Sequence, residues 1–340
     1  MRITHVVVTD AFAGTERYVA EVARRLAQRG HDVLVVGGDP ASMPGAVAPA
    51  DWRPASDLRT AAAVLARGGR PDVVHAHLTA AETAAFLAFP RHRAPVVSTR
   101  HIATRRGSST PAKVFSRVLN RFLRLQIAIS EHVGASIERA PDIVLWNGVP
   151  TSNTGYDETS RVVLAVQRLE PEKDAATAIR AWAASGLDGQ GWELQLAGDG
   201  SQRAALERLV VDLDLSGVRF LGAVDDVPDR LAASALVLAS SKQEGLGLAV
   251  LEAMAAARPV VATAVGGHLE TLPAEYPGFF PVGDAVHAGQ LLRELADDPS
   301  WRRDLGGDLR ARQRASFDVE GHVDRLIHLY SEARRGRASV

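Results

Sequence analysis

The chain has 340 residues, of which 46% are hydrophobic and none is cysteine, and its formal net charge is −1. This length and apolar fraction are typical of a globular protein with two domains. The lack of cysteine excludes disulfides, thiolate catalysis and Cys-ligated metal, and the balanced charge argues against a nucleic-acid partner. The first residues do not resemble a signal peptide and no segment is apolar enough to span a membrane, so we expect a cytoplasmic protein.

The first part of the chain alternates short apolar strands with amphipathic helices. The first strand is predicted over residues 3–8, and the helix that follows it over residues 15–29, ending at Gly30. Further elements are strands at 33–36, 73–75, 96–98, 127–129 and 143–145 and a helix at 58–67. This alternation favours a parallel sheet that is covered by helices on both faces.

The same pattern restarts after a polar segment. Residues 151–160 (TSNTGYDETS) have no apolar period, so we interpret them as the linker between two domains. The elements after it are strands at 162–166, 193–197, 219–221, 236–239 and 260–263 and helices at 285–297, 301–316 and 319–334. We therefore expect an α/β protein with two Rossmann-like domains, residues 1–150 and 161–318, and a ligand cleft between them at the carboxyl ends of both sheets.

The most informative motif is EGLGLAVLE, which runs from Glu244 to Glu252. Its glycine-rich turn leads into a helix, and the backbone N–H groups at a helix start suit a phosphate or a polar sugar. If the whole run were helical, the two carboxylates would lie about 12 Å apart along the axis, whereas the acid and nucleophile of a retaining glycosidase lie roughly 5–5.5 Å apart. The pair therefore suits the two ends of one long ligand, such as the sugar and the ribose of a nucleotide-sugar.

Two loops after predicted strands could also contact a ligand. The loop QRLEPEK follows the strand at 162–166 and contains Arg168 and Lys173, which could flank a diphosphate. Two ordinary surface charges on a solvated loop explain these residues about equally well. The run AGDG at Ala197–Gly200 permits a close backbone approach, but taken alone it is better explained as a plain turn.

These motifs occur together in a recognisable order. GTER, NGVP, QRLEPEK, AGDG, RFLGAV and EGLGLAVLEAMAAARPVVAT follow one another as in the GT4 family, and nearly the whole chain resembles these retaining glycosyltransferases of GT-B fold. The resemblance implies that the first domain binds the acceptor, that the second binds the donor, and that a last helix within residues 319–340 packs back on the first domain. Two positions depart from the family: its Gly-Gly pair is Ala13-Gly14 here, and its Gly-Arg is Gln167-Arg168.

The resemblance also implies a role for each matching residue. Arg168 and Lys173 would bind the diphosphate, Glu244 the hydroxyls of the donor sugar, and Glu252 those of the ribose. His101 would lie beside the donor sugar, although in isolation it would be interpreted as a surface histidine of a basic loop. The remaining donor-side positions are the Gly245, Leu246, Gly247 and Leu248 backbone, the base-bordering Gly198 and Val224, and Gly14 in the first βα loop.

The expected reaction follows from the same resemblance. A nucleoside-diphosphate sugar would donate its sugar to a hydroxyl by front-face substitution, without metal or cofactor. UDP is the expected nucleoside diphosphate, because it is the commoner one in the family. Arg168, Lys173 and helix N–H groups would stabilise the leaving group. The alternatives are a nucleotide-sugar 2-epimerase of the same architecture, which the motif order disfavours, and a non-catalytic sugar-nucleotide-binding protein, which the intact charged residues disfavour. The acceptor class stays open.

Two weaker patterns have simple explanations. His75 and His77 share one face of a strand, but the sequence offers no evident third metal ligand, so packing is the favoured interpretation. Asp212-Leu213-Asp214 has the DxD form of metal-dependent glycosyltransferases, yet it falls at the end of an amphipathic helix, where a solvated helix end is favoured. We predict no metal site.

Residues 100–124 form a locally basic segment in which Phe115, Val118, Leu119 and Phe122 recur at helical spacing. The segment could make a weak peripheral contact with anionic lipid at the inner face of the membrane, or form an acceptor-side pocket for an anionic group. An ordinary helix that packs its apolar face inward is the favoured interpretation, because core helices show the same pattern.

Overall fold

The computed structural model describes residues 1–107, 109–152 and 155–336 and divides into two units. Unit 1 contains Met1–Gly148 and the last helix, and unit 2 contains Val149–Asp318. Residues 153–154 lie outside the described residues, and the rest of the polar segment 151–160, which we interpreted as the linker, lies within unit 2. Its Tyr156 explains why, since the phenol donates to the Ala235 carbonyl and accepts from the Arg302 guanidinium.

Unit 1 is built on a parallel sheet of seven strands in the order β3-β2-β1-β4-β5-β6-β7. The strands are β1 (Arg2–Val7), β2 (Asp32–Gly37), β3 (Asp51–Arg53), β4 (Val73–His77), β5 (Val96–Arg100), β6 (Leu125–Ala128) and β7 (Ile143–Val144). Nearly every residue of β1, β4 and β5 is buried. Burial on both faces explains the continuous apolar runs in the sequence.

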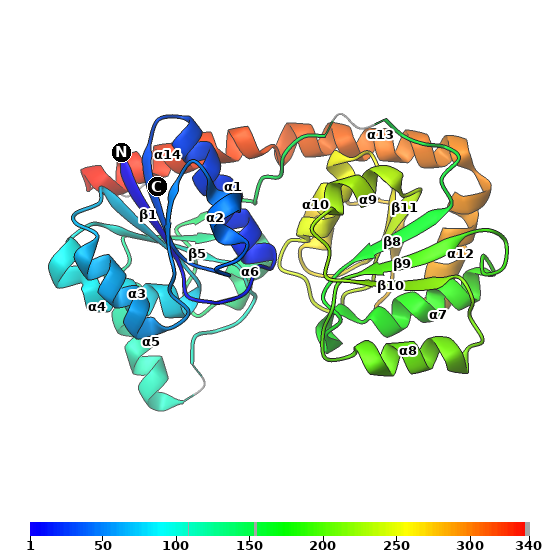
Figure 1. Ribbon diagram of the computed structural model, residues 1–340, viewed down its shortest axis with the longest axis horizontal. Coiled ribbons are helices and arrows are strands. Elements are labelled where there is room, and N and C mark those ends of the chain that lie inside the picture. Colours follow the sequence, from blue (N-terminus) through cyan, green and yellow to red (C-terminus); the bar gives the residue numbers. More distant parts are fainter. Residues whose placement is uncertain (108, 153–154, 337–340) are drawn as a thin grey trace. The chain divides into compact units, whose positions relative to one another are not determined.

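Helices cover both faces of this sheet. They are α1 (Gly14–Gln28), α2 (Met43–Val47), α3 (Leu58–Arg67), α4 (Leu78–His92), α5 (Thr110–Phe122), α6 (Glu131–Ser136) and α14 (Val319–Arg335). Figure 1 shows α1 and α14 on one side of the sheet and α3, α4 and α5 on the other. The last helix is held by ion pairs to Glu320 of α14 from Arg25 of α1 and from Arg29, which directly follows α1.

Unit 2 has a second parallel sheet, with six strands in the order β10-β9-β8-β11-β12-β13. The strands are β8 (Val162–Val166), β9 (Glu193–Ala197), β10 (Val218–Gly222), β11 (Leu236–Ala239), β12 (Val260–Thr263) and β13 (Phe279–Phe280). The helices are η1 (Pro171–Lys173), α7 (Ala175–Ser185), α8 (Arg203–Asp212), α9 (Val227–Ala233), α10 (Leu248–Ala255), α11 (His268–Thr271), α12 (Ala285–Asp297) and α13 (Pro299–Ser316). In Figure 1, α7 and α8 lie on one side of this sheet and α9 and α10 on the other.

Both sheets reverse their strand order beside their first strand. In unit 1 the reversal lies between the neighbouring strands β1 and β4, and in unit 2 it lies between the neighbouring strands β8 and β11. In parallel α/β sheets, ligands bind outside the carboxyl ends of the strands at such a reversal. The predicted α/β class with two Rossmann-like halves is therefore confirmed, although the short elements α2, β3 and β13 were not predicted. None of the described helices is long and apolar enough to cross a bilayer.

Candidate functional site

Five of the predicted donor-side residues follow carboxyl ends of strands in unit 2. Arg168 and Lys173 follow β8, Gly198 directly follows β9, and Val224 comes after β10. Glu244 follows β11. Because these strands are parallel, the five positions lie along the same edge of one sheet.

The loops after β8 and β9 interlock through a glycine. Gly198 has φ +142°, and a Cβ added to it would lie 1.9 Å from the carbonyl oxygen of Gln167. The Leu169 amide also donates to the Asp199 carbonyl. Gly198 therefore serves a close approach of two backbones, so it places the loop that carries Arg168.

Lys173 and Glu244 meet at the reversal between β8 and β11. The distance from Lys173 Nζ to Glu244 Oε2 is 2.5 Å, and both side chains are about four-fifths buried. The sequence did not predict this contact. Arg168 extends from the same loop, is 57% exposed, and pairs with Glu172 at 2.5 Å. A cation with such access can turn toward an anionic ligand.

Glu244 is held by hydrogen bonds on both carboxylate oxygens. Oε1 accepts from the Gly245 amide at 3.2 Å, and Oε2 accepts from the Ser241 hydroxyl at 3.4 Å as well as from Lys173. Burial alone would raise the pKa of Glu244, but Lys173 and His268 outweigh it and keep this pKa below its ordinary value. The carboxylate is therefore ionised at neutral pH and suited to accept hydrogen bonds from hydroxyl groups.

The turn after Glu244 is held by residues at the two ends of α11. Gly267 donates to the Glu244 carbonyl, and the Thr271 hydroxyl donates to the Leu246 carbonyl. Gly247, at φ +95°, ends the turn, and α10 begins at Leu248. The run is therefore not helical throughout. The first N–H groups of α10 have no intrahelical partners, as at any helix start.

The other motif residues lie on this turn, on α10 and in the loop before α9. Leu246 is buried, Glu252 lies half-buried in the second turn of α10, and Val224 is half-buried in the loop before α9. The structure thus brings the predicted EGLGLAVLE positions onto one turn and one helix.

His268 is a site residue that the sequence analysis missed. A Cβ on Gly247 would lie 2.9 Å from His268 Cδ2, so the imidazole packs directly against the turn. Its Nδ1 lies 3.0 Å from the carbonyl oxygen of Thr263 and must donate to it. Burial lowers the pKa of His268, although Glu244 and this hydrogen bond oppose the change. The sequence did contain a signal for His268, since it is a polar residue shortly after the predicted strand 260–263, where ligand-binding residues are expected.

In unit 1, the predicted residues follow β1 and β5. Gly14 is the first residue of α1, and His101 comes directly after β5. His101 is buried and not the surface histidine that its sequence context suggests in isolation. Its Nε2 lies 3.0 Å from Nδ1 of His77.

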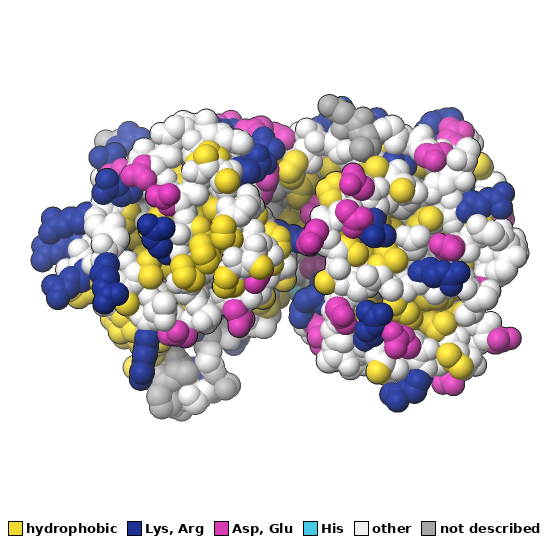
Figure 2. Space-filling model, viewed as in Figure 1, with side chains coloured by type: hydrophobic (Ala, Val, Ile, Leu, Met, Phe, Trp, Pro, Cys, Tyr) yellow, Lys and Arg dark blue, Asp and Glu magenta, His cyan; other side chains and the backbone are white. Residues whose placement is uncertain are grey.

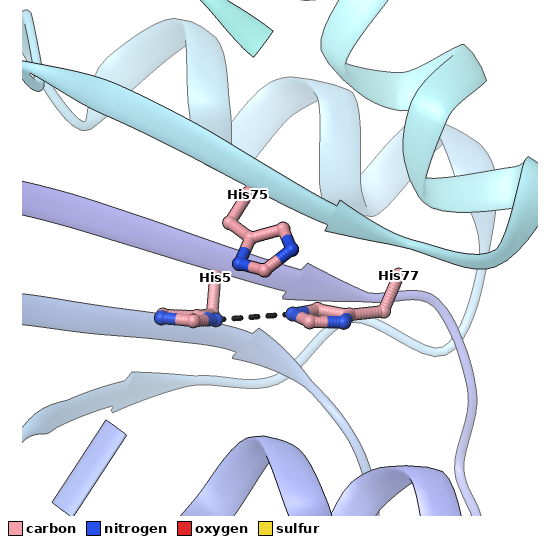
Figure 3. Close-up of side chains that lie close together, drawn as sticks. All are labelled: His5, His75 and His77. Carbon is pink, nitrogen blue, oxygen red and sulfur yellow. Dashed lines mark hydrogen bonds between the residues drawn. The ribbon is translucent and has the colours of Figure 1, made fainter. Parts of the chain in front are cut away.

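His75 and His77 have a third neighbour that the sequence did not reveal. His5 of β1 is the register partner of His75, and the ligand atoms of the three fully buried imidazoles lie within 4.8 Å of one another (Figure 3). Yet His75 already has Tyr330 and Thr99 as hydrogen-bond partners, at 2.6 and 2.7 Å. The ring nitrogens of His75 are thus engaged by the protein itself.

The basic segment divides into a buried part and an exposed part. Arg100 and Arg106 are buried and form ion pairs with Glu138, and Arg106 also pairs with the buried Glu82. Arg100 and Arg106 are therefore structural. The DxD motif is confirmed as an exposed helix end, since α8 ends at Asp212.

On α5 the predicted inward packing is only partly correct. Leu119 is buried and Phe122 is half-buried, but Phe115 and Val118 are 38% and 44% exposed, and Val114 is 53% exposed. Part of the apolar stripe of this helix thus faces solvent in unit 1.

Comparison with known proteins covers both units. The family described as Glycosyltransferase Family 4 matches residues 12–153, and the family described as Glycosyl transferases group 1 matches residues 160–298. The chain is 29% identical to N-acetyl-alpha-D-glucosaminyl L-malate synthase of Bacillus anthracis, over 53% of this chain and 48% of that protein. It is 31% identical to a GDP-mannose-dependent monoacylated alpha-(1-6)-phosphatidylinositol monomannoside mannosyltransferase of Corynebacterium glutamicum, over 53% and 50%. The chain spans about half the length of these curated relatives.

Solved structures resemble the whole chain. Alr3699/HepE of Anabaena, in complex with UDP and glucose, has a TM-score of 0.81 at 22% identity, covering 98% of this chain and all of that one. The sucrose-phosphate synthase of Thermosynechococcus elongatus has a TM-score of 0.75 at 21% identity, covering 97% of this chain and 98% of that one. At this identity the likeness shows the fold, which is the GT-B arrangement of two Rossmann-like units.

Proposed function

The chain belongs to the GT4 glycosyltransferases, and we propose that it transfers a sugar from a UDP-sugar to an acceptor hydroxyl with retention and without metal or cofactor. The observation that carries the proposal is the Lys173–Glu244 pair at the strand-order reversal of unit 2. A cation and an ionised carboxylate beside a helix start offer complementary partners for a diphosphate and for sugar hydroxyls. Complexes of Alr3699/HepE with UDP and with UDP-glucose favour UDP as the nucleotide of the donor.

The proposed chemistry uses the cations of this loop on the leaving group. As the bond from the anomeric carbon to the diphosphate oxygen breaks, negative charge grows on that oxygen. Lys173, Arg168 and the N–H groups at the start of α10 would stabilise this charge without metal. Arg168 supports the role because its exposed guanidinium can exchange Glu172 for a phosphate.

A front-face substitution fits the surroundings of Glu244. Both of its oxygens are engaged, by Lys173 and by the Gly245 amide, which suits binding of hydroxyls more than nucleophilic attack. In this step the acceptor oxygen forms the new bond to the anomeric carbon on the face that the diphosphate leaves. The acceptor proton passes to the departing diphosphate oxygen, so the sugar keeps its anomeric configuration.

Nucleotide binding tests the donor site first. Thermal unfolding of the full chain would be measured with UDP, GDP, ADP, TDP and CMP, because a ligand of the folded state raises its stability with ln(1 + [L]/Kd). We expect UDP to give the largest shift, Arg168→Ala to lose most of it, and EDTA to change neither binding nor transfer. Arg219→Ala is the matched control, since Arg219 also forms an ion pair, with Glu193, and its side chain is 55% exposed, compared with 57% for Arg168.

Other outcomes of this experiment are equally informative. A larger shift with GDP or ADP would reassign the base, and no shift with any nucleotide would contradict the donor site. An epimerised nucleotide-sugar formed without acceptor would favour the 2-epimerase alternative. Binding without transfer or hydrolysis across a broad acceptor panel would favour a non-catalytic binding protein.

We also propose that the protein is cytoplasmic and makes a weak peripheral contact with anionic lipid through α5. Val114, Phe115 and Val118 are exposed on this helix. The exposed cations on α5 are Lys113, Arg117 and Arg121. Figure 2 shows a Lys or Arg side chain beside hydrophobic ones at the lower left of unit 1, where Figure 1 has α5. An apolar stripe beside cations suits the surface of an anionic bilayer.

Vesicle sedimentation tests the membrane contact. The full chain should pellet with phosphatidylglycerol vesicles at low salt, less so with neutral phosphatidylcholine vesicles or at high salt. The variant Phe115→Ser/Val118→Ser should reduce pelleting, whereas Val211→Ser, an exposed apolar residue of unit 2, should not. Equal pelleting of all three proteins, or none with either lipid, would contradict the contact.

A further inference from the structure

Three histidines of unit 1 form a hydrogen-bonded chain that ends at the predicted site residue His101. His5 Nδ1 lies 3.0 Å from His77 Nε2, and His77 Nδ1 lies 3.0 Å from His101 Nε2. Figure 3 shows the first of these bonds, between the nearly parallel rings of His5 and His77. The chain therefore runs from the buried interior of β1, across β4, to the carboxyl end of β5.

The chain is neutral at physiological pH. Burial lowers the pKa of His5 and of His101 to about 3, and it lowers the pKa of His77 well below its ordinary value. A neutral imidazole has one N–H donor and one lone pair. Both hydrogen bonds must then run in the same direction, with every proton on Nδ1 or every proton on Nε2.

The inner end of the chain favours one of these directions. Nε2 of His5 is buried and has no hydrogen-bond partner among the described residues. A proton on this nitrogen would be an orphaned buried N–H group, which folded proteins avoid more strictly than an unused acceptor. The arrangement with protons on Nδ1 leaves only a lone pair unpartnered, so His5 donates to His77 and His77 donates to His101.

Tyr18 cannot reverse this direction. Its ring lies edge-on to the rings of His77 and His101, with centroids 6.0 and 5.2 Å away. Its hydroxyl, however, is bonded to Nε2 of His322 at 2.8 Å, whose Nδ1 must donate to the Trp146 carbonyl. The Tyr18 proton is therefore already used on His322, and its ring only covers the chain.

We propose that His5 and His77 are positioning residues that fix His101 as the Nδ1–H tautomer, so that His101 offers an N–H donor at the carboxyl end of β5 to an oxygen of a bound ligand. The inference rests on the proposed function for the identity of this ligand. A sugar hydroxyl and a phosphate both offer such an oxygen acceptor. Because the chain stays neutral, His101 provides this donor without carrying a charge.

Nitrogen NMR of the ligand-free protein tests the tautomer directly. Protonated and unprotonated ring nitrogens of ¹⁵N-labelled histidine resonate in separate ranges, and the signals that His101→Asn removes assign His101. We expect a proton on Nδ1 and none on Nε2 in both His101 and His77. A proton on Nε2 of His101, or on both nitrogens at neutral pH, would overturn the proposal whether or not the protein transfers sugar.

Two matched variants test the positioning role. His77→Phe removes the partner of His101, whereas His75→Phe alters an equally buried histidine of the same strand that bonds Tyr330 and Thr99 instead. We expect His77→Phe to average the two nitrogen signals of His101 and to lower kcat/KM about tenfold, the effect of one hydrogen bond. His75→Phe should change neither by more than about twofold.

Equal effects of the two variants, or an unchanged His101 tautomer in His77→Phe, would contradict the positioning role. Thermal unfolding of both variants separates these readouts from a general loss of stability. The wild-type spectrum and its assignment by His101→Asn do not depend on His77→Phe, so the tautomer remains testable if His77→Phe does not fold. Uracil-nucleotide binding to unit 2 is measured separately, so a failed donor site would not be mistaken for a failed tautomer.

Discussion

Lys173 and Glu244 are 71 residues apart in the chain, yet their charged atoms are separated by 2.5 Å. The pair has a chemical consequence for each residue. Without a ligand, each neutralises the other in a site with little access to water, which avoids an uncompensated buried charge. With a donor present, Lys173 would be shared with the diphosphate and Glu244 with hydroxyls of the sugar.

We expect the two residues to act as one unit in catalysis. Glu244→Gln and Lys173→Met should each lower kcat by about 10²–10³, the usual effect of losing one preorganised electrostatic partner of the transition state. The double variant should lose far less than the product of the two effects, because each single variant already breaks the pair. Steady-state kinetics of the four proteins measures this coupling.

Lys242→Met is the control for this cycle. Lys242 lies in the same loop as Glu244, but its side chain is 52% exposed and pairs with Asp174 at 3.4 Å. We expect its kcat to stay within about threefold of wild type. Independent effects of Glu244→Gln and Lys173→Met, or a loss in Lys242→Met of the same size, would remove the pair from the mechanism.

At the level of elements, the position of α10 depends on close backbone contacts. Gly267 approaches the turn so closely that a Cβ on it would lie 2.2 Å from Leu246 Cα. At the other end of α10, Gly306 of α13 packs against Ala257, where a Cβ would lie 2.1 Å from the carbonyl oxygen. The helix whose start would face the diphosphate is thus held at both of its ends.

Adjacent glycines of α13 provide a test of this packing. Gly306→Ala should lower the free energy of unfolding by about 1–3 kcal/mol, because the added methyl group overlaps the Ala257 carbonyl. Gly307→Ala meets no atom within 4 Å and should raise the same free energy by up to about 1 kcal/mol through helix propensity. Urea unfolding measures both, and equal stability of the two variants would contradict the contact.

At the scale of the whole molecule, buried neutral histidines distinguish unit 1 from unit 2. Burial lowers the pKa of His5 and His101 to about 3, of His322 to about 4, and of His75 and His77 well below the ordinary value. In unit 2, burial lowers the pKa of His268. An imidazole that is neutral when folded gains a proton in the unfolded chain below about pH 6.5.

We therefore expect acid to destabilise unit 1 first. Below about pH 6.5 the unfolded state binds more protons than the folded state, so the free energy of unfolding falls as pH drops toward 4, whereas the histidine contribution to it is constant above about pH 7. Each buried histidine contributes roughly 1.4 kcal/mol per pH unit in this window. Hydrogen exchange at about pH 7.5, 6 and 5, corrected for intrinsic rates, should show loss of protection in β1 and β4 before β8 and β11. The reverse order would contradict the neutral histidine chain.

Much of the architecture was predictable because its causes are local. Short apolar runs bounded by polar or turn-forming residues predicted β8, β9, β11 and β12 with the bounds that the structure has, and helical periodicity predicted α12. Residues after a parallel strand must lie at the ligand-binding edge, so Arg168, Lys173 and Glu244 could be placed at one edge before any contact was known. The motif order added the family.

The contacts of the site could not be predicted, because they depend on strand order and packing between distant segments. His5 joins His75 and His77 only because β1 pairs with β4, and Lys173 meets Glu244 only because β8 lies beside β11. Charge and hydropathy along the chain likewise cannot tell that Arg106 is buried while Phe115 is exposed. Local periodicity specifies the elements, whereas partners and burial follow from which elements the folded chain brings side by side.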